Sequence, residues 1–432
     1  MGDGRLVRVL EHEFLHRADV GETCWRRLQR ADREVARTQG SSVFDWSRDS
    51  VAKAKSYVGV LAVEGLTVEV LPKADDLETD ASAQRNLLFM LRRAGHLPFR
   101  DAGMAGLAEE KGSLLDVFAR VFAQRLLAEL RRGPDRGYVR REDNLRCLRG
   151  HLLIPQNIRI NAFDRTRFYV AHDQFEEDTP LNRLLKAAVY KLCGSVGSAD
   201  TRHVLGVILE ELSFVTDVPA TAALAARVPL GRLNERFRPL RDFARRVLGA
   251  TSPAPTAASQ SSFSILFPME QLYEAFVAGC LRRWAPRLGL ERTQVRVQAR
   301  GDRRWLLTGV HSGRGRAQLR PDVWVSPSGT GTGIVFDTKW KLVSSQERSK
   351  GVSPSDIYQM LAYAQAYQPE LLLLVYPRIR GMEEREWYFP GKKHRLRVVE
   401  WPVNASHQDD EEAMARKVES WVAGVSSGAT TR

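Results

Sequence analysis

Short apolar runs rich in β-branched residues, the pattern typical of β-strands, occur in the first hundred residues of the chain. Two of these runs, Tyr57–Val63 and Leu66–Leu71, flank Glu64-Gly65, and this order predicts a hairpin. The apolar spacing over residues 86–93 then predicts a short helix. We therefore expect residues 1–100 to form a β-rich N-terminal module.

The pattern over residues 101–248 is mixed and mainly helical. A helix is predicted to begin at Ser113, which forms a capping pair with Asp116, and its apolar residues recur at helical spacing up to Leu130. Gly133-Pro134 ends this helix. Further helices are predicted over residues 181–192 and 203–214, and short strands over 152–155 and 167–170. This middle region shows no catalytic pattern of its own.

Residues 249–262, GATSPAPTAASQSS, have no hydrophobic period and predict a linker at the main domain boundary. The sequence after it predicts a helix over 268–284, strands over 294–299, 305–310, 322–325 and 334–341, a helix over 354–367 and a strand over 371–376. This order indicates an α/β domain at residues 263–403, with helices flanking a mixed central sheet. A surface helix and a tail are expected over residues 404–432.

Two acids and a lysine stand out in this C-terminal domain. Asp337 interrupts the apolar strand that begins at Ile334, where an unpaired buried carboxylate would be costly. Strand alternation places Lys339 on the same side as Asp337, and the hairpin-like connection before the strand brings Asp322 beside them. Such carboxylates suit Mg²⁺ or Mn²⁺, and an ammonium can orient a water molecule or stabilise developing charge. The residues therefore suggest metal-assisted hydrolysis of a phosphodiester.

The same residues permit a simpler interpretation. A short D-x-K pattern commonly lies on a solvated sheet face, and an aspartate after a proline commonly lies in a turn. The order of Pro321-Asp322, turn, D-x-K strand and helix favours the catalytic interpretation. That helix has its own start signal, with Ser353 before Pro354 and Asp356 in the first turn. It carries Gln359 and Tyr363 four residues apart.

Together these residues resemble the PD-(D/E)xK nuclease superfamily, in the branch that has a Q-x-x-x-Y helix. The resemblance implies a restriction-endonuclease-like fold in which Asp322 and Asp337 bind the metal and Lys339 assists the nucleophile. It also implies that Gln359 and Tyr363 support the site or contact DNA near it. Ordinary helix packing is the alternative explanation for this pair, because aromatic residues at helical spacing are commonly buried.

The first core helix of that superfamily often carries a glutamate that faces the metal. Glu274 occupies the matching place in this sequence and is the third candidate metal ligand. By helical geometry it lies at the margin of the apolar face, so an inward and a solvated position are both open.

Longer segments extend the resemblance to one family. The following segments look like McrC: FPMEQLYE at 267–274, LRPD at 319–322, FDTKWK at 336–341 and SDIYQMLAY at 355–363. Residues 57–63 and 68–73 also look like the N-terminal module of that family, and residues 148–150 and 182–186 agree more weakly. McrC proteins are nuclease subunits of a modification-dependent restriction system. This likeness implies a DNA endonuclease subunit whose N-terminal module docks on McrB, an AAA+ GTPase that recognises modified cytosine. The chain has no G-x-x-x-x-G-K-[ST] loop, which agrees with GTP being bound by the partner.

Charge adds a candidate partner. The formal net charge of +13 favours a polyanion such as double-stranded DNA, although arginine used simply as a solubilising cation would give the same composition. A basic stretch with Trp305 lies just before the acidic site and comprises Arg303, Arg304, Arg314, Arg316 and Arg320. Phosphate-backbone contact and solvated loop charge are both open for these arginines.

Other compositional features exclude several classes of protein. No run approaches the ~20 apolar residues that a membrane helix needs, so we expect a soluble, cytoplasmic protein. Four scattered cysteines lack the spacing of a zinc site or a disulfide framework.

Two other functions stay open. One is a non-cleaving regulatory subunit that activates an AAA+ NTPase, although the complete set of Asp322, Asp337 and Lys339 argues against a decayed site. The other is a stand-alone PD-(D/E)xK nuclease in DNA repair or RNA processing. Cleavage by the purified chain without a partner would favour the second.

Overall fold

The computed structural model divides the chain into two compact units. One unit comprises Met1–Asp3 and Lys111–Ile265, and the other comprises Gly4–Glu110 and Leu266–Arg432. The structure describes residues 5–73, 79–97, 112–219, 228–249, 263–326, 333–341, 352–378, 384–391, 393–404 and 408–428. Within these ranges, no helix combines the length and the apolar character needed to cross a bilayer.

The N-terminal region is built on a sheet with the strand order β1-β6-β5-β10. The strands β5 (Tyr57–Val63) and β6 (Leu66–Leu71) pair antiparallel, which confirms the hairpin predicted at Glu64-Gly65. Gly65 has φ +84°, a conformation that glycine adopts without strain. β1 (Arg5–Leu10) pairs parallel with β6, and β10 (Phe263–Pro268) completes the sheet. A second, three-stranded sheet has the order β2 (Phe14–His16), β4 (Val51–Ala54), β3 (Phe44–Asp45).

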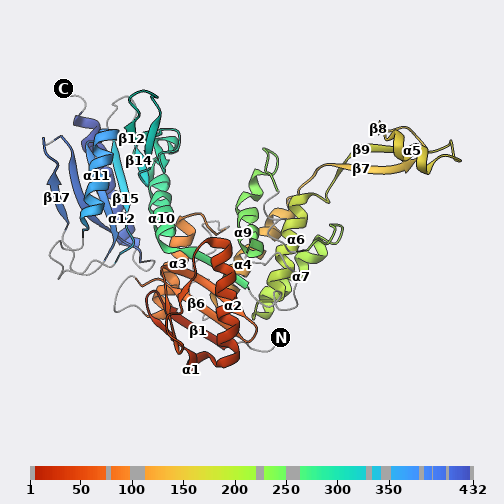
Figure 1. Cartoon of the computed structure of the whole chain (residues 1–432), viewed down its shortest axis with the longest axis horizontal. Coiled ribbons are helices and arrows are strands. Elements are labelled where there is room, and N and C mark those ends of the chain that lie inside the picture. The colour runs from red at the N-terminus through yellow and green to blue at the C-terminus, as the bar shows by residue number, and fades with distance from the viewer. Residues whose placement is uncertain are drawn as a thin grey trace. The chain divides into compact units, whose positions relative to one another are not determined.

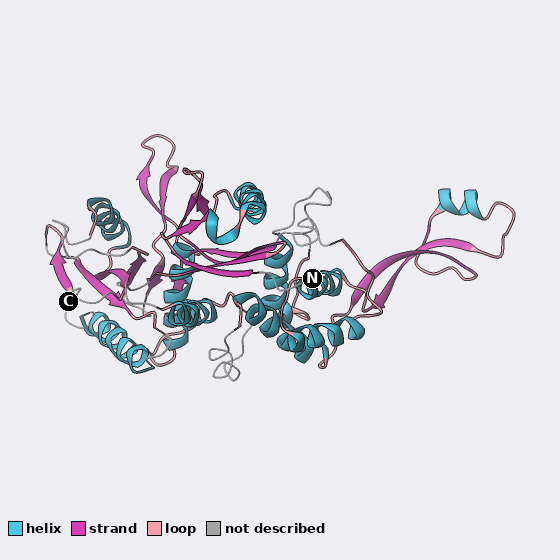
Figure 2. Cartoon of the chain, turned by 90° about the horizontal axis from the view of Figure 1, so that it is seen from below, coloured by secondary structure: helices cyan, strands magenta, loops and turns pink. Residues whose placement is uncertain are grey.

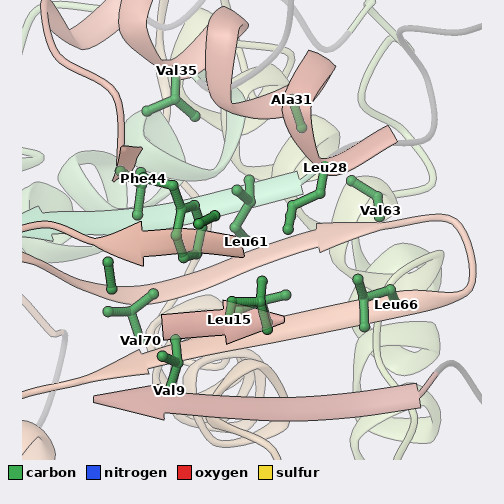
Figure 3. Packing of buried hydrophobic residues seen from close by; sticks show 14 of the residues in the cluster. Val9, Leu15, Leu28, Ala31, Val35, Phe44, Leu61, Val63, Leu66 and Val70 are labelled. Atoms are coloured by element: carbon green, nitrogen blue, oxygen red, sulfur yellow. The ribbon is translucent and has the colours of Figure 1, made fainter. Parts of the chain in front are cut away.

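An 18-residue helix that the sequence interpretation missed covers this region. α2 (Glu22–Gln39), which follows the short α1 (Arg17–Val20), carries a buried stripe among many charged residues. Figure 3 shows Leu28 and Val35 of α2 facing Leu61 of β5. The module is therefore β-rich but depends on this helix to close its core.

The C-terminal domain contains a six-stranded sheet with the order β11-β14-β15-β16-β18-β17. Its strands are β11 (Val295–Val297), β14 (Val323–Val325), β15 (Ile334–Thr338), β16 (Leu371–Pro377), β17 (Arg385–Tyr388) and β18 (Arg395–Trp401). β15, β16 and β18 run parallel, whereas β11, β14 and β17 pair antiparallel with their neighbours. The sheet is mixed, as the sequence predicted.

Helices cover both faces of this sheet (Figure 1). α11 (Pro354–Tyr367) has the predicted bounds, and it packs on the face that presents Val335 and Val398. Because side chains alternate along a strand, Trp401 of β18 points to the opposite face. There its ring stacks at 5.5 Å on Trp284 of α10 (Met269–Trp284). α12 (Gln408–Gly428) follows the sheet and contains the helix predicted for the tail.

The other unit is a helical bundle with a β-ribbon. Its helices are α4 (Leu114–Leu130), α6 (Pro180–Cys193), α7 (Ala199–Glu211) and α9 (Arg238–Gly249). Ser113 caps α4 through the N–H of Asp116, as predicted. Figures 1 and 2 show β7 (Gly137–Leu145) and β9 (Phe168–Glu176) as a long antiparallel ribbon with α5 (Ile154–Ile160) near its end.

One predicted strand of this unit is shorter than the sequence suggested, and another strand was not predicted. The strand predicted over 152–155 is only β8 (His151–Leu152), because Pro155 lies in the first turn of α5, where its missing N–H needs no partner. β7 was missed because its sequence, GYVRREDNL, has few apolar residues and no buried one. The predicted linker lies outside the described residues apart from Gly249, where α9 ends.

α3 (Asp80–Arg93) is longer than the predicted helix over 86–93, because Thr79 caps it through the N–H of Ser82. It packs closely on α10 at Gly279. A Cβ on Gly279 would lie 1.9 Å from the carbonyl oxygen of Arg93. The two helices can therefore approach this closely only with glycine at that position.

We expect Gly279→Ala to destabilise the protein by about 1–3 kcal/mol, since the carbonyl belongs to a helix backbone and cannot move freely. Thermal unfolding followed by circular dichroism measures the effect. Gly206→Ala is the matched control, because a Cβ on that helical glycine of α7 meets nothing within 4 Å. The control should stabilise its unit by about 0.5–1 kcal/mol. Equal effects of the two substitutions would contradict the close-packing argument.

Candidate active site

Asp337 and Lys339 meet on the α11 side of the sheet. Asp337 lies in β15 and is 1% exposed, on the same side of the strand as Val335. The N–H of Lys339 donates to the carbonyl of Val375 at 2.9 Å, so the strand alternation continues beyond the end of β15. The two side chains therefore share a face, as predicted. The ammonium of Lys339 lies 2.7 Å from Oδ2 of Asp337.

Asp322 is held beside this pair by the neighbouring strand residue. It immediately precedes β14, which pairs antiparallel with β15. Its Oδ2 accepts hydrogen bonds from both the N–H and the hydroxyl of Thr338, each at 2.6 Å. Oδ1 takes part in neither bond. The structure thus brings Asp322, Asp337 and Lys339 together at the predicted place.

Gln359 of α11 bridges the acid and the lysine. Its amide nitrogen donates to Oδ1 of Asp337 at 3.3 Å, and its amide oxygen accepts from the ammonium of Lys339 at 3.0 Å. The same nitrogen contacts the hydroxyl of Tyr363 at 2.8 Å, and that hydroxyl donates to the carbonyl of Arg320 at 3.0 Å. Tyr363 is also 3% exposed and part of the apolar core, so it combines packing with a polar contact at the site.

Burial and mutual repulsion make these carboxylates hard to ionise. Burial raises the pKa of Asp337 to about 7, and the charge of Asp322 adds to the rise while Lys339 opposes it. Burial also raises the pKa of Asp322, against the hydrogen bonds from Thr338. For Lys339, burial lowers the pKa, but the carboxylates of Asp337 and Asp356 outweigh it and the net shift is upward. Lys339 is therefore an ammonium at neutral pH.

Glu274, whose position the sequence left open, interacts with these acids. Burial raises the pKa of Glu274 to about 7, the charges of Asp322 and Asp337 contribute, and a hydrogen bond with the Gln298 side chain opposes the rise. Gln298 lies in a turn with φ 51° and donates its N–H to the carbonyl of Asp322 at 2.8 Å. The strand predicted over 294–299 consequently ends at Val297.

The donor set fits a hard divalent cation. After burial, the charges of Asp322 and Asp337 raise the pKa of Glu274, and the charge of Asp322 raises the pKa of Asp337. A divalent cation relieves such repulsion. Among the described residues, however, no three acid, histidine or cysteine side chains already stand close enough together to hold a metal. The fit therefore rests on ligand chemistry and charge.

One buried acid of this site was recognised in the sequence only as part of a helix start signal. Asp356, in the first turn of α11, is 5% exposed. Its carboxylate lies 3.9 Å from the ammonium of Lys339 and 3.3 Å from that of Lys341, and it accepts from the hydroxyl of Tyr376 at 3.4 Å. The sequence did contain a signal for this contact. Two lysines lie two residues apart, and the helix that follows them carries an acid in its first turn.

Trp340, which lies between Lys339 and Lys341, points to the N-terminal region. The ring of Trp340 lies 5.3 Å from that of Tyr273 on α10, and its indole N–H donates to Glu11 at 2.9 Å. Glu11 is 0% exposed and follows β1. The N-terminal region therefore contacts the segment that carries Lys339, within one compact unit.

The fold and site define a class: a multidomain α/β protein with acids and a lysine clustered beside one helix on a mixed sheet. The model of the family described as McrBC 5-methylcytosine restriction system component matches residues 52–377. Because this match covers well over half of the chain, the protein belongs to that family. The family resemblance noted in the sequence is confirmed.

Solved structures show a similar fold. The chain is 20% identical to a chain of the "Refined half-complex from tetradecameric assembly of Thermococcus gammatolerans McrB AAA+ hexamers with bound McrC", with a TM-score of 0.65, covering 96% of this chain and 100% of that one. For a chain of the "Cryo-EM structure of the Thermococcus gammatolerans McrBC complex", the identity is 24%, the TM-score 0.50 and the coverage 65% and 88%. A comparison with curated protein sequences found no match.

Without a divalent cation, we expect Glu274→Gln to stabilise the protein at pH 8 and to have no effect at pH 4. The folded-state pKa of about 7 exceeds the ordinary value of 4.5, so the folded chain binds more protons than the unfolded chain between these values. Stability contributed by this group is therefore lost as pH rises through that window. The gain should be roughly 1 kcal/mol, less than the pKa shift alone implies, because the carboxyl is only half-buried.

Urea unfolding at the two pH values tests this expectation. Glu211→Gln, at an exposed position of α7, is the matched control and should change stability at neither pH. A loss of stability at pH 8 in Glu274→Gln would mean that this carboxylate is favourably paired rather than repelled.

Proposed function

We propose that this chain is the DNA-cutting subunit of a modification-dependent restriction complex, and that residues 263–403 form a PD-(D/E)xK nuclease domain. The observation that carries the proposal is the position of the Lys339 ammonium, between Asp337 and Gln359 and beside Asp322. Two acids, a lysine and a glutamine from a Q-x-x-x-Y helix together match what hydrolysis of a phosphodiester needs.

In this proposal, Asp322, Asp337 and Glu274 hold Mg²⁺ or Mn²⁺. The ion, when bound, polarises the phosphate and lowers the pKa of an attacking water. Lys339 has an upward-shifted pKa, so it acts as a hydrogen-bond donor and a positive charge rather than as a base. Gln359 fixes the ammonium, and Tyr363 fixes Gln359. Each of these side chains is thus positioned before the substrate arrives, which favours catalysis.

The proposed partners are double-stranded DNA carrying a 5-methylcytosine-type modification and an AAA+ GTPase like McrB, which binds the GTP. Support comes from the family match and from the similar structures, whose descriptions name McrB AAA+ hexamers with bound McrC. In this proposal the N-terminal module docks on the ring and stimulates its NTPase. The net charge of +13 agrees with a nucleic-acid substrate.

Asp337→Asn and Lys339→Ala should each reduce Mg²⁺-dependent cleavage of modified DNA by the reconstituted complex by about 100- to 1000-fold. GTP turnover by the partner should remain stimulated, because neither substitution alters the N-terminal module. Lys417→Ala is the control, since that lysine pairs with Glu384 on the surface and should be dispensable. If the unsubstituted chain stimulates GTP turnover by the partner but the complex cuts no DNA, this outcome favours a regulatory subunit instead.

Mg²⁺ should raise the unfolding temperature of the parental chain, and Asp337→Asn should remove most of this effect. A ligand at about 100 times its dissociation constant stabilises the folded state by ~2.7 kcal/mol, provided that it binds only the folded chain. Differential scanning fluorimetry with increasing Mg²⁺ measures the shift without requiring activity. An equal shift in Asp337→Asn would place the cation elsewhere and remove the support for this site.

A further inference from the structure

A two-stranded ribbon leads directly into the candidate active site. β12 (Arg304–Thr308) pairs antiparallel with β13 (Gly315–Leu319) and forms a sheet separate from the six-stranded one (Figure 1). Only Arg320 and Pro321 separate β13 from Asp322. The base of the ribbon is therefore a direct neighbour, along the chain, of the first acid.

The base of this ribbon is attached to the helix that carries Gln359. The hydroxyl of Tyr367 on α11 lies 3.2 Å from the carbonyl oxygen of Leu319 and 3.1 Å from that of Asp302, and its single O–H is shared between these two acceptors. The guanidinium of Arg304 lies 4.6 Å from the centre of the Tyr367 ring and donates to the carbonyl of Ala366 at 2.6 Å. α11 therefore holds the base of the ribbon and also carries Gln359, which places the ribbon beside the candidate site.

The outer part of the ribbon is exposed and positively charged. Leu307 and Val310 are 62% and 94% exposed. Arg314 and Arg316 lie on this part, and Arg303 lies just before β12 at the base. All three are exposed, and none forms an ion pair with an acid in the described part of the chain. Their charge is thus uncompensated, and an anionic partner complements it.

Some other cations of the same domain are neutralised locally. Arg304 pairs with Asp302 at 3.1 Å, at the base of the ribbon. In the C-terminal domain, Arg287 pairs with Glu412 at 2.6 Å, and Lys417 pairs with Glu384 at 2.6 Å. Arg292, Arg320 and Arg416 of the same domain are also exposed and form no ion pair among the described residues. What distinguishes Arg314 and Arg316 is their position on a ribbon that leads into the candidate site.

We propose that this ribbon binds the phosphate backbone of duplex DNA beside the bond to be cut, with Arg303, Arg314 and Arg316 as the contacts. The inference rests on the proposed nuclease function, since it names the surface through which that site holds its substrate. Exposed arginines suit this role because a guanidinium donates two parallel hydrogen bonds to a phosphate. Trp305 stiffens the ribbon, because its ring occupies the space that a Cβ on Gly315 would fill.

Strand geometry sets the reach of these arginines. Arg316 lies six residues before Asp322, and a strand rises about 3.3 Å per residue, which gives at most ~20 Å. Since duplex DNA rises about 3.4 Å for each base pair along one strand, Arg316 reaches phosphates within about six base pairs of the cut, and Arg314, two residues further from Asp322 along the chain, within about eight. A duplex that ends closer to the cut than this distance, on the side where the ribbon lies, should bind more weakly.

Binding of a labelled duplex to the full-length chain tests the proposal, with Asp337→Asn present throughout to prevent cutting. Adding Arg314→Ala and Arg316→Ala should weaken binding at least about tenfold, and the slope of log Kd against log salt should fall by about 2, one for each phosphate that is no longer neutralised. The matched control is Arg287→Ala with Lys417→Ala, which removes the same charge from paired positions and should leave affinity and slope nearly unchanged.

Several results would overturn the proposal. Equal weakening by the control pair would mean that only the total charge matters. If the two arginine substitutions leave DNA binding unchanged but abolish binding to the AAA+ partner, the ribbon is a protein-docking surface. If they weaken binding of duplex RNA as much as binding of duplex DNA, the assignment to DNA is wrong. The proposed nuclease function fails separately. If the intact complex never cuts but DNA binding still requires Arg314 and Arg316, the ribbon proposal stands without it.

Discussion

A carboxylate buried inside an apolar strand is the constraint on which the C-terminal domain depends. Asp337 is 1% exposed in β15, and an unpaired charge there would cost several kcal/mol. Lys339 and Gln359 stabilise it, but burial and, after it, repulsion from Asp322 keep the pKa of Asp337 at about 7. The fold thus retains a locally unfavourable charge arrangement, which is the kind of strain expected where chemistry takes place.

The helix α11 positions the side chains around Asp337. Its buried face, with Met360 and Tyr367, packs on the sheet, and its polar positions place Gln359 between acid and lysine and Asp356 beside the lysines. Tyr363 and Tyr367 extend the same helix to the base of the ribbon formed by β12 and β13. One helix therefore holds both the candidate site residues and the base of the ribbon, because its successive turns contact each of them.

The N-terminal region and the C-terminal domain lie in one compact unit although the second unit separates them in sequence. The indole of Trp340 reaches Glu11, and the neighbouring residue is Lys339. In the proposed function, the module that docks on the partner is thus in physical contact with the segment that carries the lysine. The close approach of α3 and α10 at Gly279 holds the same two regions together.

The sequence by itself determined the features that depend on neighbouring residues. Strand period two placed Asp337 and Lys339 on one face, and Ser353-Pro354 fixed the start of α11. Only the tertiary structure decided that Glu274 is half-buried, within range of the charges of Asp322 and Asp337. It also decided that Asp356 is buried beside two lysines and that the polar β7 forms a ribbon. Those outcomes depend on partners distant in the chain, because the burial and pairing of a charged group follow from what packs against it and not from its own local pattern.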